Sequence, residues 1–338
     1  MPATVQSDPG SEEFAVLANR FRPELLAHCY RMLGSVQDAE DQVQETLVRA
    51  WRSYSNFEGR SSLRTWLYRI ATNTCLRALE NRERRPLPSG LGAPGYDPAG
   101  SITPPMSEVP WLEPFPDALL RPESADPASV VAARSGLRLA LIAALQQLPV
   151  RQRTVLILRD VLGWRAAEVA ELLGVSVVAV NSALQRAREQ VRQSVPEADE
   201  IREPSSRADR AVLDRYAAAI ENADGTALVD LLHEDATFEM PPRPTWFRGR
   251  ENIVRFLGTQ VLTSPGAYTM VPATANGQPA LAIYSRAEDG TRRAYGVQVL
   301  ALRNGRIASV VAFLDPGLFP GFGLSAELPA ADQPVPGQ

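Results

Sequence analysis

The sequence predicts a protein of several domains, in which two all-α regions are followed by an α+β domain. Three observations lead to this prediction. Apolar residues recur at helical spacing in two separate stretches of the N-terminal half. A segment with eleven prolines in residues 86–130 separates these stretches. Near the C-terminus, amphipathic helices precede strand-forming runs. We therefore expect a helical region (11–85), a Pro-rich acidic linker (86–127), a second helical region (128–194) and an α+β domain (207–325).

The first region is expected to hold three main helices. Pro23 stands at a favourable first helical position, and Gly34 ends that helix. Apolar residues at helical spacing, from Ala39 to Trp51, predict a second helix with Trp51 in its apolar stripe. Ser61 or Ser62 then caps a long third helix.

That third helix carries a basic face. Arg69, Asn73 and Arg77 recur every four residues, and further arginines follow at 82, 84 and 85. Arginines beside aromatic residues such as Phe57 and Trp66 suit unpaired DNA, because aromatic rings stack on splayed bases while Arg follows the backbone. Two alternatives stay open: Trp66 packs in the core, or the arginines form a solvated face.

The second region contains the pattern of a helix-turn-helix. A short helix ends at Gly174, and Ser176 caps the next one. The second helix of such a motif enters the major groove, where Asn and Gln bond base edges and Arg suits phosphates. The alternative is an ordinary helical hairpin with a solvated polar face. The expected DNA contacts are Asn181, Gln185, Arg186 and Arg188.

These motifs carry a family resemblance. The stretch DAEDQVQETLVRAW, followed by SSLRTWLYRIATN, is similar to region 2 of extracytoplasmic-function (ECF) sigma factors of the sigma-70 family. The stretch LPVRQRTVLILRDVLGWRAAEVAELLGVSVVAVNSALQRAR is similar to their region 4. The resemblance covers residues 12–85 and 128–193 in the family's order. It implies a promoter-recognition subunit of RNA polymerase, which is not an enzyme. A stand-alone helix-turn-helix regulator would leave Asp38–Thr46 and the basic helix unexplained.

The resemblance also implies roles for individual residues. Asp38–Thr46 would dock on the clamp helices of the polymerase β′ subunit, although its acids could equally form a solvated face. Asn181 and Ala183 stand where the family commonly has Arg and Lys, which implies a weaker −35 contact or a different sequence preference. The expected polymerase anchors are Asp38, Asp41 and Glu45. The expected −10 residues are Asn56, Phe57, Trp66, Arg69, Asn73, Arg77, Arg84 and Arg85. The expected −35 residues are Asn181, Ser182, Gln185, Arg186 and Arg188.

The linker between the two regions has two interpretations. In sigma factors the connector threads the RNA path of the polymerase, and an acidic, Pro-rich strand can imitate nucleic acid there. The alternative is a plain spacer. The stretch VPWLEPFPDALL combines apolar and acidic residues, so we expect it to dock onto another surface.

The last domain resembles the SnoaL-like, cone-shaped α+β fold of the nuclear-transport-factor-2 superfamily. Strands are expected at Ala280–Arg286, Arg293–Arg303 and Arg306–Leu314, with a hairpin at Asn304–Gly305. The resemblance extends over AAAIENADGTALVDLLHEDATFEMPPRPTWFRGRENIVRFL and YGVQVLALRNGRIASVVAFLDPGLF. Fusion of such a domain to a sigma factor implies regulation in cis.

A regulatory segment is expected after the last of these strands. A related subgroup has an Asn-Pro-Asp-Lys-Leu motif that modulates activity, and residues 315–319 of this chain occupy the corresponding place. The subgroup's DGGG motif is absent, and MPPRPTWFRG stands roughly there, so a shared switching mechanism is in doubt. The candidate regulatory residues are Asp315, Pro316 and Leu318.

Some relatives of the C-terminal fold are enzymes, so an isomerase or hydrolase is the alternative function. Acid–base chemistry would need a buried carboxylate with a shifted pKa in the pocket. Glu239 alternates with Phe238 and Met240 and therefore faces away from both, and His233 is expected to cap a helix. The polar candidates are His233, Asp235, Glu239, Tyr284 and Tyr295.

Composition limits the remaining possibilities. The net charge is −4, and all 35 basic residues are arginines, of which seven fall in residues 59–85 and seven in residues 151–192. Cys29 and Cys75 lack metal-ligand spacing and are expected in the core, with no metal or cofactor. The N-terminus resembles no signal peptide, which favours a soluble cytoplasmic protein without membrane contact. Expected partners are core polymerase and promoter DNA, while a small-molecule ligand or a separate anti-sigma protein is left open.

Overall fold

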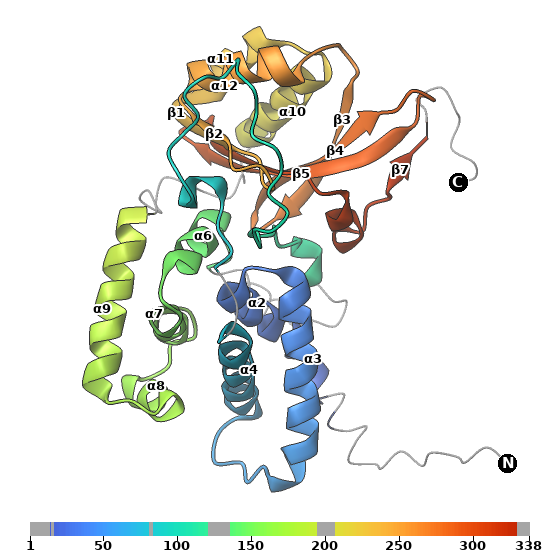
Figure 1. The fold of residues 1–338 in the computed structure, drawn as a ribbon. Coiled ribbons are helices and arrows are strands. Elements are labelled where there is room, and N and C mark those ends of the chain that lie inside the picture. The colour runs from blue at the N-terminus through green and yellow to red at the C-terminus, as the bar shows by residue number, and fades with distance from the viewer. Residues whose placement is uncertain (1–13, 15–16, 81–83, 121–135, 195–206, 330–338) are drawn as a thin grey trace, which may run out of the picture. The chain divides into compact units, whose positions relative to one another are not determined.

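The computed structural model describes residues 14, 17–80, 84–120, 136–194 and 207–329 (Figure 1). The chain divides into two compact units. One contains residues 1–84 and 119–194, and the other contains residues 85–118 and 195–338. The predicted linker is therefore divided, because most of it belongs to the same unit as the C-terminal domain.

The first helical region consists of α2 (Arg22–Leu33), α3 (Val36–Ser53) and α4 (Leu63–Leu79), with a 3-10 turn, η1 (Tyr54–Asn56), between the last two. Its predicted caps are confirmed. Gly34 ends α2 with a left-handed φ of 73°, which Gly adopts at no steric cost. The Ser62 hydroxyl accepts a hydrogen bond from the Thr65 N–H at 3.1 Å and starts α4.

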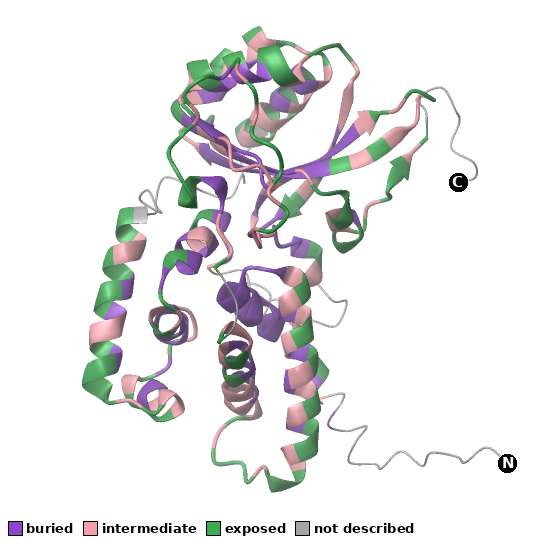
Figure 2. Cartoon of the chain, viewed as in Figure 1, coloured by how far each residue is buried: buried purple, intermediate pink, exposed green. Residues whose placement is uncertain are grey.

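The core of this region lies around α2, which Figure 2 shows as almost wholly buried. Cys29 and Cys75 are fully buried, as predicted. The His28 Nε2 lies 3.0 Å from the Thr72 hydroxyl, and burial lowers the pKa of His28 to about 3. The prediction for Trp51 was wrong, because its side chain is 52% exposed on α3.

The second helical region comprises α6 (Leu139–Gln147), α7 (Val150–Leu156), a π-helical turn η4 (Ile157–Val161), α8 (Ala166–Leu173) and α9 (Val177–Ser194). Gly174 ends α8 with a φ of 62°, and the Ser176 hydroxyl accepts from the Ala179 N–H at 3.1 Å. The two helices bend by 103°, within the range of about 90–120° for a helix-turn-helix. No single described helix is long and apolar enough to cross a bilayer; the pair α8 and α9 passes that test only jointly, by length and composition.

The C-terminal domain has three helices and a curved sheet. The helices are α10 (Arg207–Glu221), α11 (Gly225–Leu231) and α12 (Arg250–Phe256), which continues into a π-helical turn η6 (Leu257–Val261). The strands are β1 (Leu232–Glu239), β2 (Trp246–Arg248), β3 (Tyr268–Ala275), β4 (Gln278–Arg286), β5 (Arg292–Arg303), β6 (Arg306–Phe313) and β7 (Glu327–Leu328). The order is β2-β1-β6-β5-β4-β3, with β7 on β5. Only β1 and β6 pair in parallel among these strands. The helices cover one face of the sheet (Figure 1), and the predicted fold class is confirmed.

Two Asn-Gly turns organise this sheet. Asn304 and Gly305 have φ values of 52° and 72° between β5 and β6, so the predicted hairpin is confirmed. Asn276 and Gly277, with φ values of 58° and 65°, form the same kind of turn between β3 and β4. The sequence analysis had not predicted β2, β3 or β7. It was also wrong about His233, which lies in β1 rather than at a helix end.

Candidate functional site

The second helix of the helix-turn-helix, α9, exposes its polar face. Asn181, Gln185 and Arg186 are exposed, while Val180, Leu184 and Ala187 on the other face are buried. Ser182 is half-buried. The exposed Arg188 donates to both carboxylate oxygens of Asp160, at 2.8 and 2.6 Å. Three of the five expected −35 residues therefore present free polar groups to solvent.

The basic helix α4 differs, because part of its face is engaged. The Arg69 guanidinium is bonded to the Glu171 carboxylate of α8. Asn73 and Arg77 are exposed. The Phe57 ring lies 4.9 Å from the Trp66 ring, centroid to centroid, and both are half-buried at the end of α4 next to the exposed Asn56.

The last two expected −10 residues follow α4. Arg84 is exposed. The Arg85 guanidinium donates to the Trp111 carbonyl at 3.0 Å and lies 3.6 Å from the Glu113 carboxylate. In this state Arg85 is therefore occupied by the linker rather than accessible to DNA.

A buried arginine joins the two helical regions. The last carbonyls of α2 have no partner within the helix and carry the negative end of its dipole. The Arg153 guanidinium donates to the Met32 carbonyl at 2.5 Å and to Gln146 Oε1 at 2.7 Å, and Gln146 Nε2 donates to the Arg31 carbonyl at 3.3 Å. Burial lowers the pKa of Arg153 to about 10, so it stays charged at neutral pH. The second region thus caps α2 from outside.

The expected polymerase anchors lie on α3. Asp41 is exposed, Asp38 and Glu45 are half-buried, and Glu45 bonds Arg49 at 2.5 Å. Val48 and Trp51 are exposed on the same helix, by 42% and 52%. Exposed Trp residues are enriched at binding surfaces. The sequence analysis did not consider Trp51 for such a surface, since it assigned Trp51 to the core.

A further feature is the segment of residues 85–118, which we call the strap; the sequence analysis expected docking only for its second part. It lies against the C-terminal domain and belongs to the same compact unit. Trp246 of β2 is a central contact: its carbonyl accepts from the Gly95 N–H at 2.7 Å, and its indole donates to the Gly92 carbonyl at 3.0 Å. A Cβ on Gly95 would lie 2.9 Å from Phe247 Cε1 and 3.3 Å from the Trp246 carbonyl, so only glycine fits there.

Further hydrogen bonds hold both halves of the strap. In its second half, Phe115 exchanges two bonds of 2.8 Å with Asn276, one with its side chain and one with its backbone. The buried Asp117 accepts from the Gly277 N–H at 2.9 Å. These bonds confirm the expectation that VPWLEPFPDALL docks onto another surface.

The start of the strap meets residues 111 and 112. The Leu112 N–H donates to the Pro86 carbonyl at 3.1 Å, and Arg85 bonds Trp111 as described above. Residues 86–112 of the 34-residue strap therefore form a closed loop while it is docked. Residues 113–118 continue from this loop to the β3–β4 turn.

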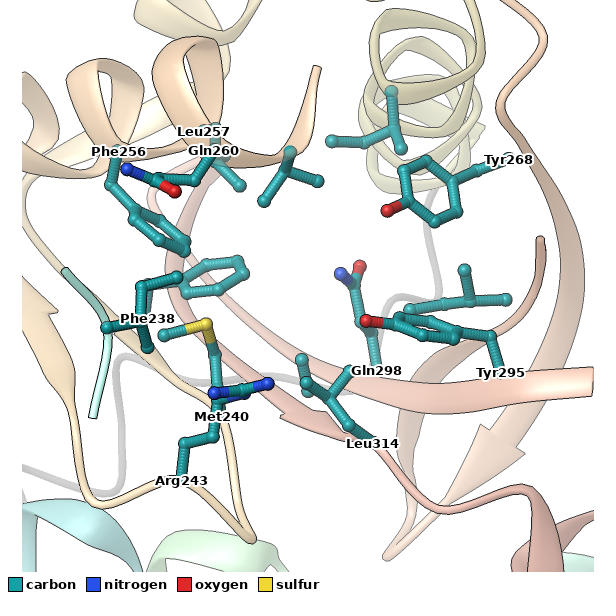
Figure 3. A pocket seen from close by; sticks show the side chains of 15 residues that line it. Phe238, Met240, Arg243, Phe256, Leu257, Gln260, Tyr268, Tyr295, Gln298 and Leu314 are labelled. Atoms are coloured by element: carbon teal, nitrogen blue, oxygen red, sulfur yellow. The ribbon is translucent and has the colours of Figure 1, made fainter. Parts of the chain in front are cut away.

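The C-terminal domain contains a cavity, which Figure 3 shows from close by. Of the five polar candidates from the sequence, Tyr295 alone lines it. The Tyr284 hydroxyl instead donates to the Ser325 carbonyl. His233 Nδ1 lies 2.8 Å from Arg303 Nη2, and the exposed Asp235 is 3.9 Å from the same nitrogen.

Glu239 lies on the opposite side of β1 from the cavity. Its neighbours Phe238 and Met240 line the cavity, as the alternation predicted. The Glu239 carboxylate is buried and accepts from the Ser89 N–H at 2.8 Å. Burial raises the pKa of Glu239, and the Ser89 hydrogen bond opposes that shift. The buried acid of this domain therefore holds the strap and does not face the cavity.

The expected regulatory segment forms a 3-10 turn, η7 (Pro316–Phe322). The Asp315 carboxylate caps this turn by accepting from the Gly317 N–H at 2.8 Å. Leu318 is half-buried, and the buried Phe319 packs edge-on against Tyr284 at 5.1 Å between centroids. A Cβ on Gly321 would lie 3.5 Å from Pro116 Cγ, so the turn borders the strap.

Comparison with known proteins identifies three family models that match separate parts of the chain. The family models "Sigma-70 region 2", "Sigma-70, region 4" and "SnoaL-like domain" match residues 17–85, 138–191 and 213–310. The chain is 51% identical over 324 residues to the ECF RNA polymerase sigma factor SigG of Mycobacterium tuberculosis, covering 95% of this chain and 86% of that protein. SigJ of the same organism is 29% identical over 314 residues, 89% of this chain and 91% of SigJ. The crystal structure of SigJ matches with a TM-score of 0.57 at 25% identity, covering 94% and 100% of the two chains.

Proposed function

The chain belongs to the ECF sigma factors of RNA polymerase, and from this premise we propose that it reads −10 and −35 promoter elements under control of its own SnoaL-like domain. The observation that carries this proposal is the docked strap, in which the 3.1 Å bond between Leu112 and Pro86 closes residues 86–112 into a loop. The SnoaL-like domain would act by holding or releasing this loop.

The distances involved support such control. Elements named −10 and −35 lie about 25 base pairs apart, which is on the order of 85 Å along B-DNA at about 3.4 Å per base pair. A released strap of 34 residues could span on the order of 110 Å when extended. In the docked strap, residues 86–112 are closed into a loop and contribute little of that reach. Release of the strap would therefore let the two helical regions separate.

The state of the helical regions supports the same proposal. Arg69, an expected −10 residue, is paired with Glu171 of the helix-turn-helix, and Arg153 holds the end of α2. Both contacts join regions that must read separate DNA sites. We infer that promoter binding requires them to break, with Asn56–Asn73 reading the −10 element and α9 reading the −35 element.

The polymerase contact is assigned to α3, with Asp38, Asp41 and Glu45 as polar anchors and Val48 and Trp51 as the apolar part. The strap, once released, would be free to follow the RNA path of the polymerase. This proposal includes a place in the cytoplasm, where transcription occurs, and it leaves open whether a separate anti-sigma protein also binds.

The enzymatic alternative finds less support. Among the described residues that line the cavity, none is Asp, Glu, His or Cys, so general acid–base or nucleophilic catalysis lacks its usual groups. The buried carboxylate of Glu239 is bonded to the strap instead. A role of the domain in regulation needs no such group.

The proposal is tested with the full chain and purified core polymerase. Run-off transcription should depend on the promoter, and loss of either the −10 or the −35 element should reduce it. Core binding should be measured in parallel by fluorescence anisotropy of a labelled chain. Promoter-independent output, or no binding to core polymerase, would sink the assignment of promoter recognition.

A further inference from the structure

The cavity of the C-terminal domain has a volume of about 220 Å³ and mostly apolar walls. It lies between the sheet and the helices α10 and α12. The rings of Phe238 and Phe256, whose centroids are 5.8 Å apart, offer flat apolar surfaces. Met240 and Leu257 add aliphatic surface to the wall. Its volume is below the range of about 300–1,000 Å³ that holds drug-sized ligands. The walls therefore suit a small molecule with one or two rings.

Three uncharged polar groups converge on this cavity. Figure 3 shows the hydroxyls of Tyr268 and Tyr295 and the amide of Gln298 directed toward the same hollow. The rings of Tyr268 and Tyr295 are 5.8 Å apart. A bulge in β5 makes this possible, because Ile283 pairs with Gly296 and Tyr284 with Ala294, which leaves Tyr295 free of the pairing. A bulge re-aims a side chain in this way.

Gln298 has a fixed orientation. The buried Tyr216 hydroxyl donates to Gln298 Oε1 at 3.1 Å, so the amide oxygen is occupied and the Nε2 group is left as a donor. Among the described residues, no acceptor is bonded to that Nε2. An amide donor that is 5% exposed and faces a cavity is suited to an oxygen acceptor of a ligand.

The strap supplies part of the cavity wall. Ile102 is the strap residue among the lining side chains. It is held beside two cavity residues: Arg243 donates to the Thr103 carbonyl at 3.1 Å, and Gln260 Nε2 lies 3.3 Å from the Ala99 carbonyl. The cavity is thus complete only while the strap is docked.

We propose that this cavity binds a neutral one- or two-ring molecule with a carbonyl or hydroxyl oxygen, which accepts a hydrogen bond from Gln298 while its rings pack between the aromatic walls and Ile102. Arg243 is the one charged side chain among the described lining residues, and its guanidinium is bonded to the strap. A cation would meet no carboxylate there. The lining residues therefore suit a neutral ligand that has one or two rings and one oxygen.

This ligand would stabilise the docked strap. A molecule that contacts Ile102 binds the docked state more tightly than the released state, and it shifts the population by that difference in affinity. The regulatory consequence rests on the proposed function, in which release of the strap permits transcription. Binding itself does not depend on that proposal.

The test uses 2-naphthol, a neutral two-ring probe with one hydroxyl, titrated against the full chain and followed by its fluorescence. Wild type should bind it saturably. Gln298→Glu keeps the acceptor for Tyr216 but removes the donor, so its Kd for 2-naphthol should rise about tenfold, which corresponds to about 1.4 kcal/mol. Naphthalene lacks the oxygen and should bind both proteins with similar Kd.

A second pair of variants tests the location. Ala312→Phe fills the cavity and should abolish binding, whereas Ala308→Phe, at a half-buried alanine of the same strand outside the cavity, should bind as wild type does. Saturating 2-naphthol should also slow hydrogen exchange of the Gly95 and Phe115 amides in the strap. No saturable binding by wild type up to about 1 mM, or equal binding by the two alanine variants, would overturn the proposal.

The outcomes separate this proposal from the proposed function. If 2-naphthol binds and protects the strap but the chain fails to support promoter-dependent transcription, the cavity assignment stands and the promoter assignment fails. If transcription is normal and the probe does not bind, the cavity assignment alone fails.

Discussion

Helix α9, for which we propose −35 recognition, and the strap are held in opposite ways. Helix α9 buries one face, with Val180 and Leu184 as part of it, and leaves its polar side in solvent. The strap has no regular secondary structure beyond short 3-10 turns, and hydrogen bonds to β1, β2 and the β3–β4 turn hold it. Helix α9 is a permanent part of its fold, because its detachment would expose the buried side chains of the second helical region to solvent.

The strap is different in kind, because it has no regular core of its own and is held by scattered hydrogen bonds and a few buried side chains, among them Leu112 and Phe115. Each hydrogen bond contributes about 0.5–1.5 kcal/mol net, and each buried Leu or Phe contributes about 1.5–3 kcal/mol. A small change in those contacts should therefore shift the strap population and leave both folds intact. In the proposed function, promoter recognition belongs to the helices and its control belongs to the strap.

The largest effect is expected from Gly95→Val. A Cβ at Gly95 would lie 2.9 Å from the buried Phe247 ring, which stacks on Phe256 at 4.6 Å between centroids and cannot easily move. Overpacking of this kind costs about 1–3 kcal/mol, which is about 5- to 150-fold in the docking equilibrium. Run-off transcription should rise about tenfold.

The matched control is Gly92→Val, since no atom lies within 4 Å of a Cβ at Gly92. It should transcribe as wild type does. Equal stimulation by both substitutions would mean that the strap responds to the loss of glycine and not to its contact with β2.

The next largest effect is expected on helix α9. Gln185→Ala removes a side chain suited to adenine in the −35 element, and each bidentate base contact provides about 1–3 kcal/mol of discrimination. Holoenzyme affinity for its own −35 sequence should fall about tenfold in a filter-binding assay. Gln193→Ala, at an exposed residue that bonds Glu189, is the control, and a similar loss there would contradict a specific role for Gln185.

A smaller effect is expected on the polymerase surface of α3. Trp51→Ala removes an exposed indole of the same helix as Asp41 and Glu45, and a loss of about 1–2 kcal/mol is a factor of about 5–30. Anisotropy titration should show weaker binding to core polymerase by that factor. Val229→Ala, at an exposed apolar residue of α11, should leave core binding unchanged.

The smallest effect is expected from pH. Burial raises the pKa of Glu239 when the strap is docked, whereas the unfolded chain has the ordinary value of about 4.3. Stabilisation by this carboxyl is then complete below that ordinary value and is lost as pH rises through the raised pKa. Urea unfolding should show that the free energy of unfolding of wild type falls as pH rises through this range. The free energy of unfolding of Glu239→Gln should not show this fall. If the two proteins show the same pH dependence of the unfolding free energy, Glu239 makes no pH-dependent contribution and the prediction is wrong.

The sequence analysis predicted the helices better than the rest because their signals are local. Gly34, Gly174 and Ser62 act within one helical turn of themselves, and the Asn304–Gly305 turn is equally local. The β3–β4 hairpin had the same kind of signal in Asn276–Gly277. It was overlooked because Tyr268–Ala275 contains a proline and several polar residues, which obscure the apolar alternation of a strand.

Local sequence patterns could not predict the docking of the strap or the lining of the cavity. Strap contacts join backbone groups to partners far away in the sequence, such as Gly95 with Trp246, and no periodicity marks them. The cavity uses the uncharged groups Gln298 and Tyr268, while the sequence candidates were chosen for acid–base chemistry. Only the bulge in β5 directs Tyr295 to the cavity, and a bulge leaves no clear pattern in the sequence.

The most direct test of strap control compares the two Asn-Gly turns. Asn276→Gly keeps the positive φ that the turn requires and removes the side chain that accepts from Phe115. Asn304→Gly makes the same change in the β5–β6 turn, where the asparagine is exposed. The measurement is run-off transcription by full-length wild type, Asn276→Gly and Asn304→Gly with core polymerase. Control by the strap predicts a several-fold higher output for Asn276→Gly alone, and equal or lower output from Asn276→Gly would contradict it.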